Sequence, residues 1–408
     1  MTKAVFANRP DVLVIGGSMA GLCAAITARQ AGATVGIVEA SPQYMRGGNL
    51  RHARNIRLPH EGPTHYSPGI YRGAEFEQEI IEIAEGAGDL ELIRTLAVRA
   101  ADLACWLADQ GVVFQTDHLP YSRRTAFFLG GGKAAANALY ARVHALGIDV
   151  AYECPMTELD MLDLPARAVI LCSGAGQAGQ GHAFINRGTP FNCGSLADNL
   201  IRAGAETGGR SDAAHLVAID ARSPPHDGGI VTRIDGMEVG MMVDQNGQRF
   251  ADETEVTGPR RFTRWGQLVA SLPIPKATLV LDAEGRIKVP VLAFPAMAAS
   301  TLDVMAGMID VDATLLRRSA EECGRVKTAP FFAYPVAPGL TFACHALRVD
   351  RSTRVKMRDG TVRENLFAAG AIMAACLLNT GYLSGIALTI SAVFGRIAGE
   401  AAARHALG

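Results

Sequence analysis

The sequence predicts an α/β protein in which a Rossmann-like domain is interrupted by a smaller α+β domain. Three observations lead to this prediction. A strand, a glycine-rich turn, a helix and a second strand ending in an acid follow one another between Asp11 and Glu39. Short apolar runs, typical of buried parallel strands, recur from residues 168 and 365. The segment 221–329 is richer in proline and charge, as expected for a separate domain.

The first βαβ unit carries the strongest local pattern. The predicted strand 11–15 is followed by the turn Gly-Gly-Ser-Met-Ala-Gly at 16–21, a helix ending at Gly32, and the strand 34–38 before Glu39. This order, within about 30 residues, is typical of a site for the ADP half of a dinucleotide. The carboxylate at this place can accept a hydrogen bond from a free ribose 2′-hydroxyl, which favours FAD or NAD over NADP.

Later elements extend the same domain. Helical periodicity is expected over 75–114, and Gly130-Gly-Gly-Lys133 opens another helix at 134–146. Strands are expected at 150–152, 168–173 and 365–370, with a late strand returning to the first sheet. The apolar stretch 366–394 is interrupted by glycines, so it is interpreted as strand, loop and buried helix. The domains are then 1–220 and 330–408 for the nucleotide-binding domain, and 221–329 for the inserted cap.

Composition excludes several other classes of protein. A formal net charge of −1 argues against a nucleic-acid partner. The eight cysteines form no C-x-x-C pair and show no zinc-like spacing with histidine, so neither a metal site nor an iron–sulfur cluster is expected. Free thiols and a short polar N-terminus predict a cytoplasmic protein.

Several further blocks resemble the succinate dehydrogenase/fumarate reductase flavoprotein superfamily. Within it, the sequence is most similar to the FAD-dependent tricarballylate dehydrogenases and to a cobalamin-pathway homologue that oxidises a precorrin. The resemblance implies FAD as cofactor and a separate iron–sulfur or membrane electron-transfer protein as partner, with this chain cytoplasmic or peripheral at the inner membrane. The blocks that carry it are 46–57, 127–133, 187–192, 228–233, 247–253, 366–370, 377–387 and 395–399.

The resemblance also implies which residues hold FAD. Asn49 stands where succinate dehydrogenases carry a histidine bonded to the cofactor, so non-covalent FAD is expected. Ser18 replaces a fingerprint glycine, and Ala371 replaces an acid of the family. The expected cofactor-binding residues are Gly16, Gly17, Ser18, Ala20, Gly21, Glu39, Ala40, Gly47, Gly48, Asn49, Gly131, Gly132, Ser173, Gly174, Gly370, Ala371, Gly385 and Ile386.

A cationic segment after the second strand suits a substrate with several carboxylates. It contains Arg54 and Arg57, which are expected to contact substrate or flavin, and His52. A solvated charged face is the alternative. His215 resembles the histidine that holds a substrate carboxylate in fumarate reductases, although a structural histidine gives the same pattern. Tyr382 stands where those enzymes place an arginine, which argues against fumarate or succinate and suggests a hydrogen-bond donor or acid/base group.

The predicted function is oxidation of a polycarboxylate resembling tricarballylate to cis-aconitate, with hydride transfer to N5 of FAD. The resemblance implies that Glu253 and Arg261 move the accompanying proton, whereas a salt-bridged surface loop is the alternative for this segment. Two other functions remain open. The protein could oxidise a tetrapyrrole or another biosynthetic intermediate, or be a flavin-poor, non-catalytic homologue, because Ser18 and Ala371 depart from the family pattern.

Overall fold

The chain forms two compact units. The computed structural model describes residues 6–116, 124–176, 184–228, 230–258 and 260–408. Unit 1 consists of Met1–Gln180, Gly188–Ala214 and Phe342–Gly408, and unit 2 of Gly181–Arg187 and His215–Thr341. The α/β fold is confirmed, but the limits of the inserted unit differ from 221 and 329. They fall within the long strands β8 (Thr207–Asp220) and β12 (Phe331–Leu347), where no turn or loop marks a boundary.

Unit 1 is built on one mostly parallel sheet, ordered β13-β14-β6-β1-β2-β5. Its central strand β1 pairs with β2 on one side and β6 on the other, with Val12 opposite both Val35 and Ala168. The late strand β14 adds in parallel beside β6, as the sequence predicts, and β13 closes this edge antiparallel. The strands are β1 (Val12–Ile15), β2 (Val35–Val38), β5 (Asp149–Ala151), β6 (Ala168–Leu171), β13 (Arg354–Lys356) and β14 (Val362–Ala368).

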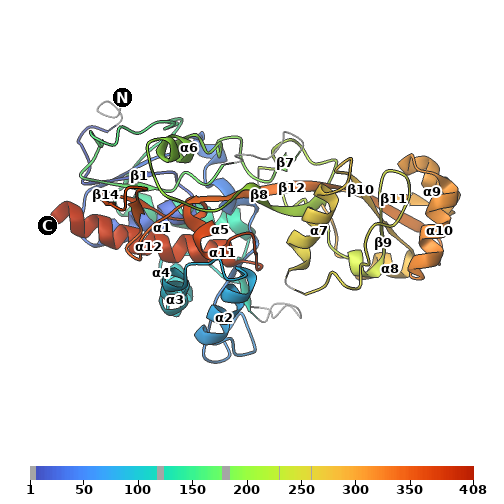
Figure 1. The fold of residues 1–408 in the computed structure, drawn as a ribbon. Coiled ribbons are helices and arrows are strands. Elements are labelled where there is room, and N and C mark those ends of the chain that lie inside the picture. Colours follow the sequence, from blue (N-terminus) through green and yellow to red (C-terminus); the bar gives the residue numbers. More distant parts are fainter. Residues whose placement is uncertain (1–5, 117–123, 177–183, 229, 259) are drawn as a thin grey trace. The chain divides into compact units, whose positions relative to one another are not determined.

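Two helices of unit 1, α1 (Met19–Gln30) and α12 (Ile386–Leu407), run side by side (Figure 1). Gly395 and Gly399 allow this contact, because a Cβ at either position would overlap the carbonyl oxygen of Ala20 or Ala24. By length and composition α12 could cross a membrane, yet 72% of its apolar window is buried inside the protein. A core helix has these same properties.

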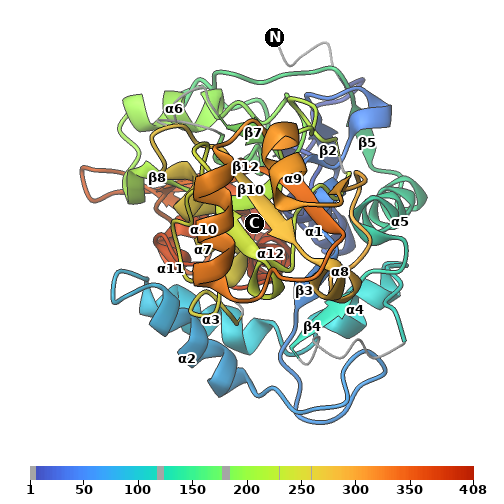
Figure 2. The ribbon, with the colours of Figure 1, turned by 90° about the vertical axis from the view of Figure 1, so that its right-hand side faces the viewer.

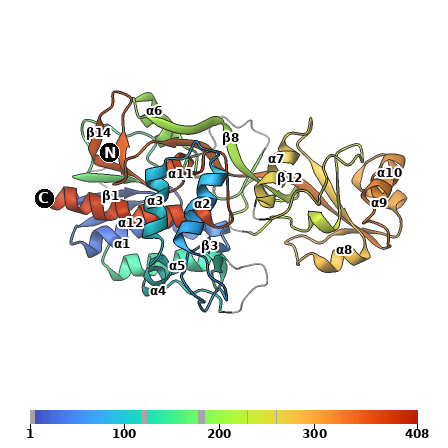
Figure 3. The same cartoon turned by 60° about the horizontal axis from the view of Figure 1, so that its bottom comes forward.

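The remaining elements of unit 1 surround this sheet. The short strands β3 (Asn55–Arg57) and β4 (Thr125–Phe127) form an antiparallel pair. Helices α2 (Gly73–Ile83) and α3 (Leu90–Arg99) lie side by side (Figures 1 and 3). The others are the 3-10 turns η2 (Gln43–Met45) and η3 (Gly48–His52), and helices α4 (Leu103–Asp109), α5 (Gly131–Ala145), α6 (Ser195–Arg202) and α11 (Ala371–Leu378).

Unit 2 is built on a sheet ordered β11-β12-β10-β9, with β7 and β8 pairing to β12. One core lies around Trp265 and Tyr334, and a second lies under the paired helices α9 and α10 (Figure 2). Gly266 lets α7 approach the backbone of β8, because a Cβ would overlap Leu216. Its elements are β7 (Ile185–Asn186), η4 (Met237–Val239), β9 (Met241–Val243), α7 (Arg261–Ala270), β10 (Ala277–Leu281), α8 (Ala283–Lys288), β11 (Met297–Ala299), α9 (Leu302–Ile309) and α10 (Ala313–Cys323).

Candidate cofactor site and acid/base residues

The carboxyl ends of four parallel strands in unit 1 bring the predicted cofactor residues together. The segments that leave β1, β2, β6 and β14 begin at Gly16, Glu39, Cys172 and Ala369. The chain leaves β1 toward β2 and leaves the neighbouring strand β6 toward β14, so these two connections run in opposite directions. Ligands of doubly wound sheets bind at such a switch point.

The turn after β1 has the geometry of a pyrophosphate-binding turn. Gly16 has φ +101°, and a Cβ there would lie 2.5 Å from the carbonyl oxygen of Cys172. Gly21 packs against Gly16 so closely that a Cβ would overlap the Gly16 carbonyl oxygen. Ser18 is the N-cap of α1, but its hydroxyl does not cap the helix, and the first turn contains no acid. The positive N-terminal end of the α1 dipole therefore faces the sheet edge without an acid in its own first turn, which suits the binding of an anion.

The Glu39 carboxylate is fixed at the end of β2. It is 7% exposed and accepts hydrogen bonds from the backbone N–H groups of Gly17 (2.8 Å) and Ser41 (2.9 Å), one on each oxygen. Each oxygen keeps a second lone pair, so the group can still accept from ribose hydroxyls. Tyr140 donates to the Gly17 carbonyl oxygen at 2.8 Å. Burial raises the pKa of Tyr140 well above its usual value, so it remains a neutral donor.

Two buried hydroxyls at this edge indicate that a bound molecule belongs there. The Oγ atoms of Ser41 and Ser173, which follow β2 and β6, are buried without a hydrogen-bond partner among the described residues. Buried hydroxyls normally have a partner. Together with the glycine turn and Glu39, they fit the hydroxyl and phosphate groups of a dinucleotide.

The loop after β2 runs past this edge. Gly47 and Gly48 have φ of +105° and +50°, and a Cβ on Gly48 would lie 3.3 Å from the Cβ of Ser18. Asn49 lies in the η3 turn that follows. Gly132, at the start of α5, donates its N–H to the Ala53 carbonyl oxygen at 2.8 Å. A Cβ there would overlap the Leu50 carbonyl oxygen, so Gly132 holds this loop in place.

Other predicted cofactor residues lie at or beneath the same edge. Ala20 and Ile386 are 4% and 0% exposed, so they belong to the supporting core. Gly370, with φ +90°, packs on Ala20, and Gly385, with φ +81°, packs on the backbone of β3. Gly174 has φ +82° and lies against Asn192. Three further predicted residues are half-buried: Ala40, Gly131 and Ala371.

Arg57 has a structural environment instead of the substrate contact expected from the sequence. It is 2% exposed and donates to the Tyr71 hydroxyl (2.7 Å) and the Glu79 carboxylate (2.6 Å). Its charge is therefore compensated within unit 1, and an added carboxylate would compete with Glu79. Arg54 and Tyr382 are half-buried and His52 is buried. These three remain candidates for substrate binding.

The structure does not join Glu253 to Arg261. Glu253 is fully buried and accepts from the Met242 N–H (2.8 Å), from Arg249 (2.6 Å) and from Arg325. Arg261 donates to the Gly258 carbonyl oxygen at 3.1 Å, and no hydrogen bond connects it to Glu253 in the described part of the chain. The expected proton path therefore lacks its link, because the Glu253 carboxylate is held by two other cations.

His215 lies in the core of unit 2. It is 1% exposed, and burial lowers its pKa from 6.5 to about 3. The imidazole is therefore neutral at physiological pH. It can donate or accept a hydrogen bond, but it supplies no positive charge for a carboxylate.

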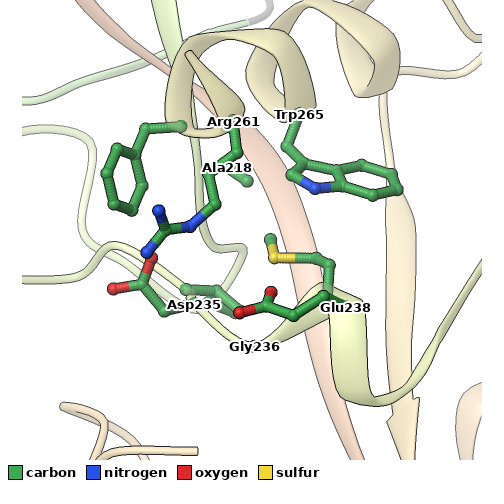
Figure 4. Close-up of a pocket in the computed structure, with 9 residues that line it drawn as sticks. Ala218, Asp235, Gly236, Glu238, Arg261 and Trp265 are labelled. Atoms are coloured by element: carbon green, nitrogen blue, oxygen red, sulfur yellow. The ribbon is translucent and has the colours of Figure 1, made fainter. Parts of the chain in front are cut away.

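Arg261 lines a small cavity within unit 2 (Figure 4). Trp265 contributes to the wall from the next turn of α7, and Asp235 and Glu238 contribute from the segment before β9. Figure 4 shows the Arg261 guanidinium pointing toward the Asp235 carboxylate. The sequence prediction missed these three residues. The spacing of Arg261 and Trp265, four residues apart on one helix face, is the signal that would have found Trp265.

Comparison with known proteins decides the family. The model of a family described as "FAD binding domain" matches residues 11–388. The chain belongs to this family of FAD-binding domains. Its cofactor is FAD, as the family resemblance implies; the glycine turn and Glu39 alone leave FAD and NAD open. No group of three or more His, Cys, Asp and Glu residues within the described ranges is placed to hold a metal ion.

Similar proteins of this FAD-binding family support the wider resemblance. NADH:fumarate oxidoreductase of Klebsiella pneumoniae is 22% identical over 98% of this chain, which spans 48% of that protein. An open flavocytochrome c3 fumarate reductase is 19% identical, with a TM-score of 0.78 over 98% of this chain and 79% of that one. The 3-ketosteroid Δ1-dehydrogenase of Sterolibacterium denitrificans is 16% identical, with a TM-score of 0.79 over 97% and 99%.

The two solved structures confirm the fold, and the Klebsiella protein shows a similarity in sequence to a fumarate oxidoreductase. The chain spans about half the length of the Klebsiella relative. Membership of the tricarballylate dehydrogenase family stays a prediction.

Proposed function

We propose that this chain is an FAD-dependent dehydrogenase that oxidises a CH–CH bond of a polycarboxylate resembling tricarballylate, giving cis-aconitate. The FAD-binding family supports the flavin chemistry. Two relatives are named for unsaturated carboxylates: the fumarate oxidoreductase of Klebsiella and an NADH:acrylate oxidoreductase of Vibrio harveyi, 38% identical over 19% of this chain. A substrate of the same chemical class is therefore proposed.

One observation carries the proposal. The glycine loop that touches Ser18, at the FAD-binding edge, leads within a few residues to His52 and Arg54. A guanidinium and an imidazole group thus follow directly from the loop that reaches the cofactor site. Such groups bind carboxylates through charge-assisted hydrogen bonds. Tyr382, which follows Gly381 before α12, offers a further hydroxyl donor.

The glycine turn and Glu39 would hold FAD, which would supply the redox chemistry as hydride acceptor. The residues of the chain orient the substrate and neutralise its charge, and Arg261 exchanges the proton. Asn49 in place of a histidine supports non-covalent binding of FAD. The electrons are proposed to leave to a separate iron–sulfur or membrane electron-transfer protein, with the chain in the cytoplasm or at the inner membrane through that partner.

An anaerobic titration tests this function. The purified protein is loaded with FAD, and its visible spectrum is followed as tricarballylate is added, with succinate as the control substrate. Bleaching by tricarballylate alone is the expected result. Arg54→Gln should raise the concentration that is required by about tenfold, the loss of one charged hydrogen bond. Arg94→Gln should leave it unchanged, because Arg94 is exposed on α3 and pairs with Glu77 on the surface.

The other outcomes separate the alternatives. A protein that binds FAD but is bleached by neither acid would contradict the polycarboxylate and would favour a tetrapyrrole or another biosynthetic intermediate as substrate. Failure to take up FAD would overturn the dehydrogenase and favour a non-catalytic homologue.

A further inference from the structure

The cavity beside Arg261 contains an unusual set of polar groups. Its volume is about 10 Å³, which is room for about one water molecule. Trp265 is 1% exposed, and its indole Nε1–H has no hydrogen-bond partner among the described residues. The Nε–H of Arg261 is also buried and has no hydrogen-bond partner among the described residues. Glu238, which also lines the cavity, has no ion pair with any described residue.

The side chains face a common space. Figure 4 shows the indole nitrogen of Trp265, the guanidinium of Arg261 and the carboxylate of Glu238 around the cavity. Two donors and one acceptor are what a single buried water requires, because such waters usually make about three hydrogen bonds to otherwise unpaired groups. Asp235 is paired with Arg233 at 2.6 Å, whereas Glu238 has no such pair and is the carboxylate that we assign to this water.

The proposed reaction also needs a second proton acceptor next to Arg261. An arginine keeps its proton in proteins, so it cannot store the proton of the substrate alone. It can take a proton at one nitrogen only while it releases another. Glu253 cannot receive that proton readily, because Arg249 and Arg325 hold its carboxylate.

We propose that Glu238, through one water held by Trp265 Nε1–H, is the positioning residue that receives protons from Arg261. The inference rests on the proposed function. As the substrate proton bonds to one Arg261 nitrogen, an Arg261 N–H proton passes to the water, and a water proton passes to the Glu238 carboxylate. Arg261 stays cationic, Glu238 becomes neutral and later releases the proton to solvent, and no electrons move in this step.

A substrate-independent experiment tests the site. The chain has two tryptophans, Trp106 in unit 1 and Trp265 in unit 2, so a ¹⁵N-labelled, FAD-loaded sample gives two indole signals. Trp106→Phe and Trp265→Phe assign them. The Trp265 indole proton should show a cross-peak to a long-lived water. Glu238→Gln should change the position of this indole signal, because the group that accepts from the water changes from a carboxylate to a neutral amide.

The matched control is Glu321→Gln, an exposed acid on α10 of the same unit. It should leave the position of the Trp265 signal unchanged, and an unchanged Trp106 signal shows that unit 1 is intact. Absence of the water cross-peak, or a Trp265 signal that Glu238→Gln leaves unchanged, would overturn the proposal whatever the substrate is.

Turnover provides the second readout. If tricarballylate reduces the flavin, Glu238→Gln should slow reduction about 100-fold, a usual contribution of proton transfer. An unchanged rate would contradict the role of Glu238. If tricarballylate does not reduce the flavin, the proposed function fails, while the indole signals still decide whether Glu238 and the water form this site.

Discussion

At the scale of single residues, the surroundings of Glu253 predict a structural role that can be separated from catalysis. The carboxylate is fully buried between Arg249 and Arg325. Glu253→Gln would leave both cations without their partner, and removing one member of a buried ion pair costs about 3 kcal/mol or more. We expect a loss of about 3 kcal/mol in the free energy of unfolding, measured by urea denaturation.

Asp252 provides the control for this prediction. It pairs with the same Arg249, but its side chain is 46% exposed, and exposed pairs contribute about 0–1 kcal/mol. Asp252→Asn should therefore change the unfolding midpoint little. A Glu253→Gln variant of wild-type stability that had lost turnover would instead support the catalytic role expected from the sequence.

At the scale of elements, the contact between α5 and the η3 turn should control FAD binding. Gly132 opens α5 against the Leu50 carbonyl oxygen, with no room for a Cβ. Gly132→Ala must displace backbone, and overpacking of this kind costs about 1–3 kcal/mol. Because η3 continues the loop that touches Ser18, we expect both weaker FAD binding and a lower melting temperature, measured by fluorescence titration and by thermal unfolding.

Gly73→Ala at the start of α2 is the matched change. The nearest atom to a Cβ there is 3.8 Å away, and alanine is the better helix former by up to about 1 kcal/mol. We expect unchanged FAD affinity and equal or higher stability. If both variants bound FAD equally well, the α5–η3 contact would not position the cofactor loop.

The sheet was predictable because its elements are local. The run from Asp11 to Glu39 contains strand, turn, helix and strand in sequence, and the apolar strand from Ala168 has the composition of a buried neighbour. The domain limits were not predictable. They lie inside the extended strands β8 and β12, where the backbone stays extended and no turn signal separates the two units.

Only part of the candidate site could be predicted, for a related reason. Glu39 and the glycine turn follow a spacing that the ADP group imposes. The ion pair between Glu253 and Arg325 follows no such spacing, because these residues lie 72 positions apart in the chain. The same holds for Arg57, whose charge is compensated by Glu79, 22 positions away. No periodicity relates such pairs, since tertiary packing alone brings them together.

At the scale of the whole molecule, the stability of unit 2 should depend on pH through His215. Burial lowers its pKa from 6.5 to about 3, so the unfolded chain binds the proton more readily. The stabilisation is complete above pH 6.5 and is lost as pH falls toward 3. Between pH 7 and pH 4.5 we expect a loss of about 2 kcal/mol from this group, measured as urea unfolding followed by Trp265 fluorescence in the Trp106→Phe protein.

The neutral variant His215→Gln, made in the same background, separates this effect from other titrations. It should be less stable at pH 7, because a core side chain has changed, but it should lose about 2 kcal/mol less on acidification. An equal loss in both proteins would contradict the assignment to His215.

The three-part makeup of unit 1 has a consequence for the order of folding during synthesis. Its sheet needs β14 (Val362–Ala368) beside β6, and α12 comes still later. All of unit 2 precedes these pieces in the chain and emerges from the ribosome before them, and nascent chains fold progressively from their N-terminus. Unit 2 can therefore mature while the nucleotide-binding half is still waiting for its final strand. A nascent chain that has emerged as far as residue 350 would present a finished insert on an unfinished host, with the apolar edge of β6 exposed to chaperones.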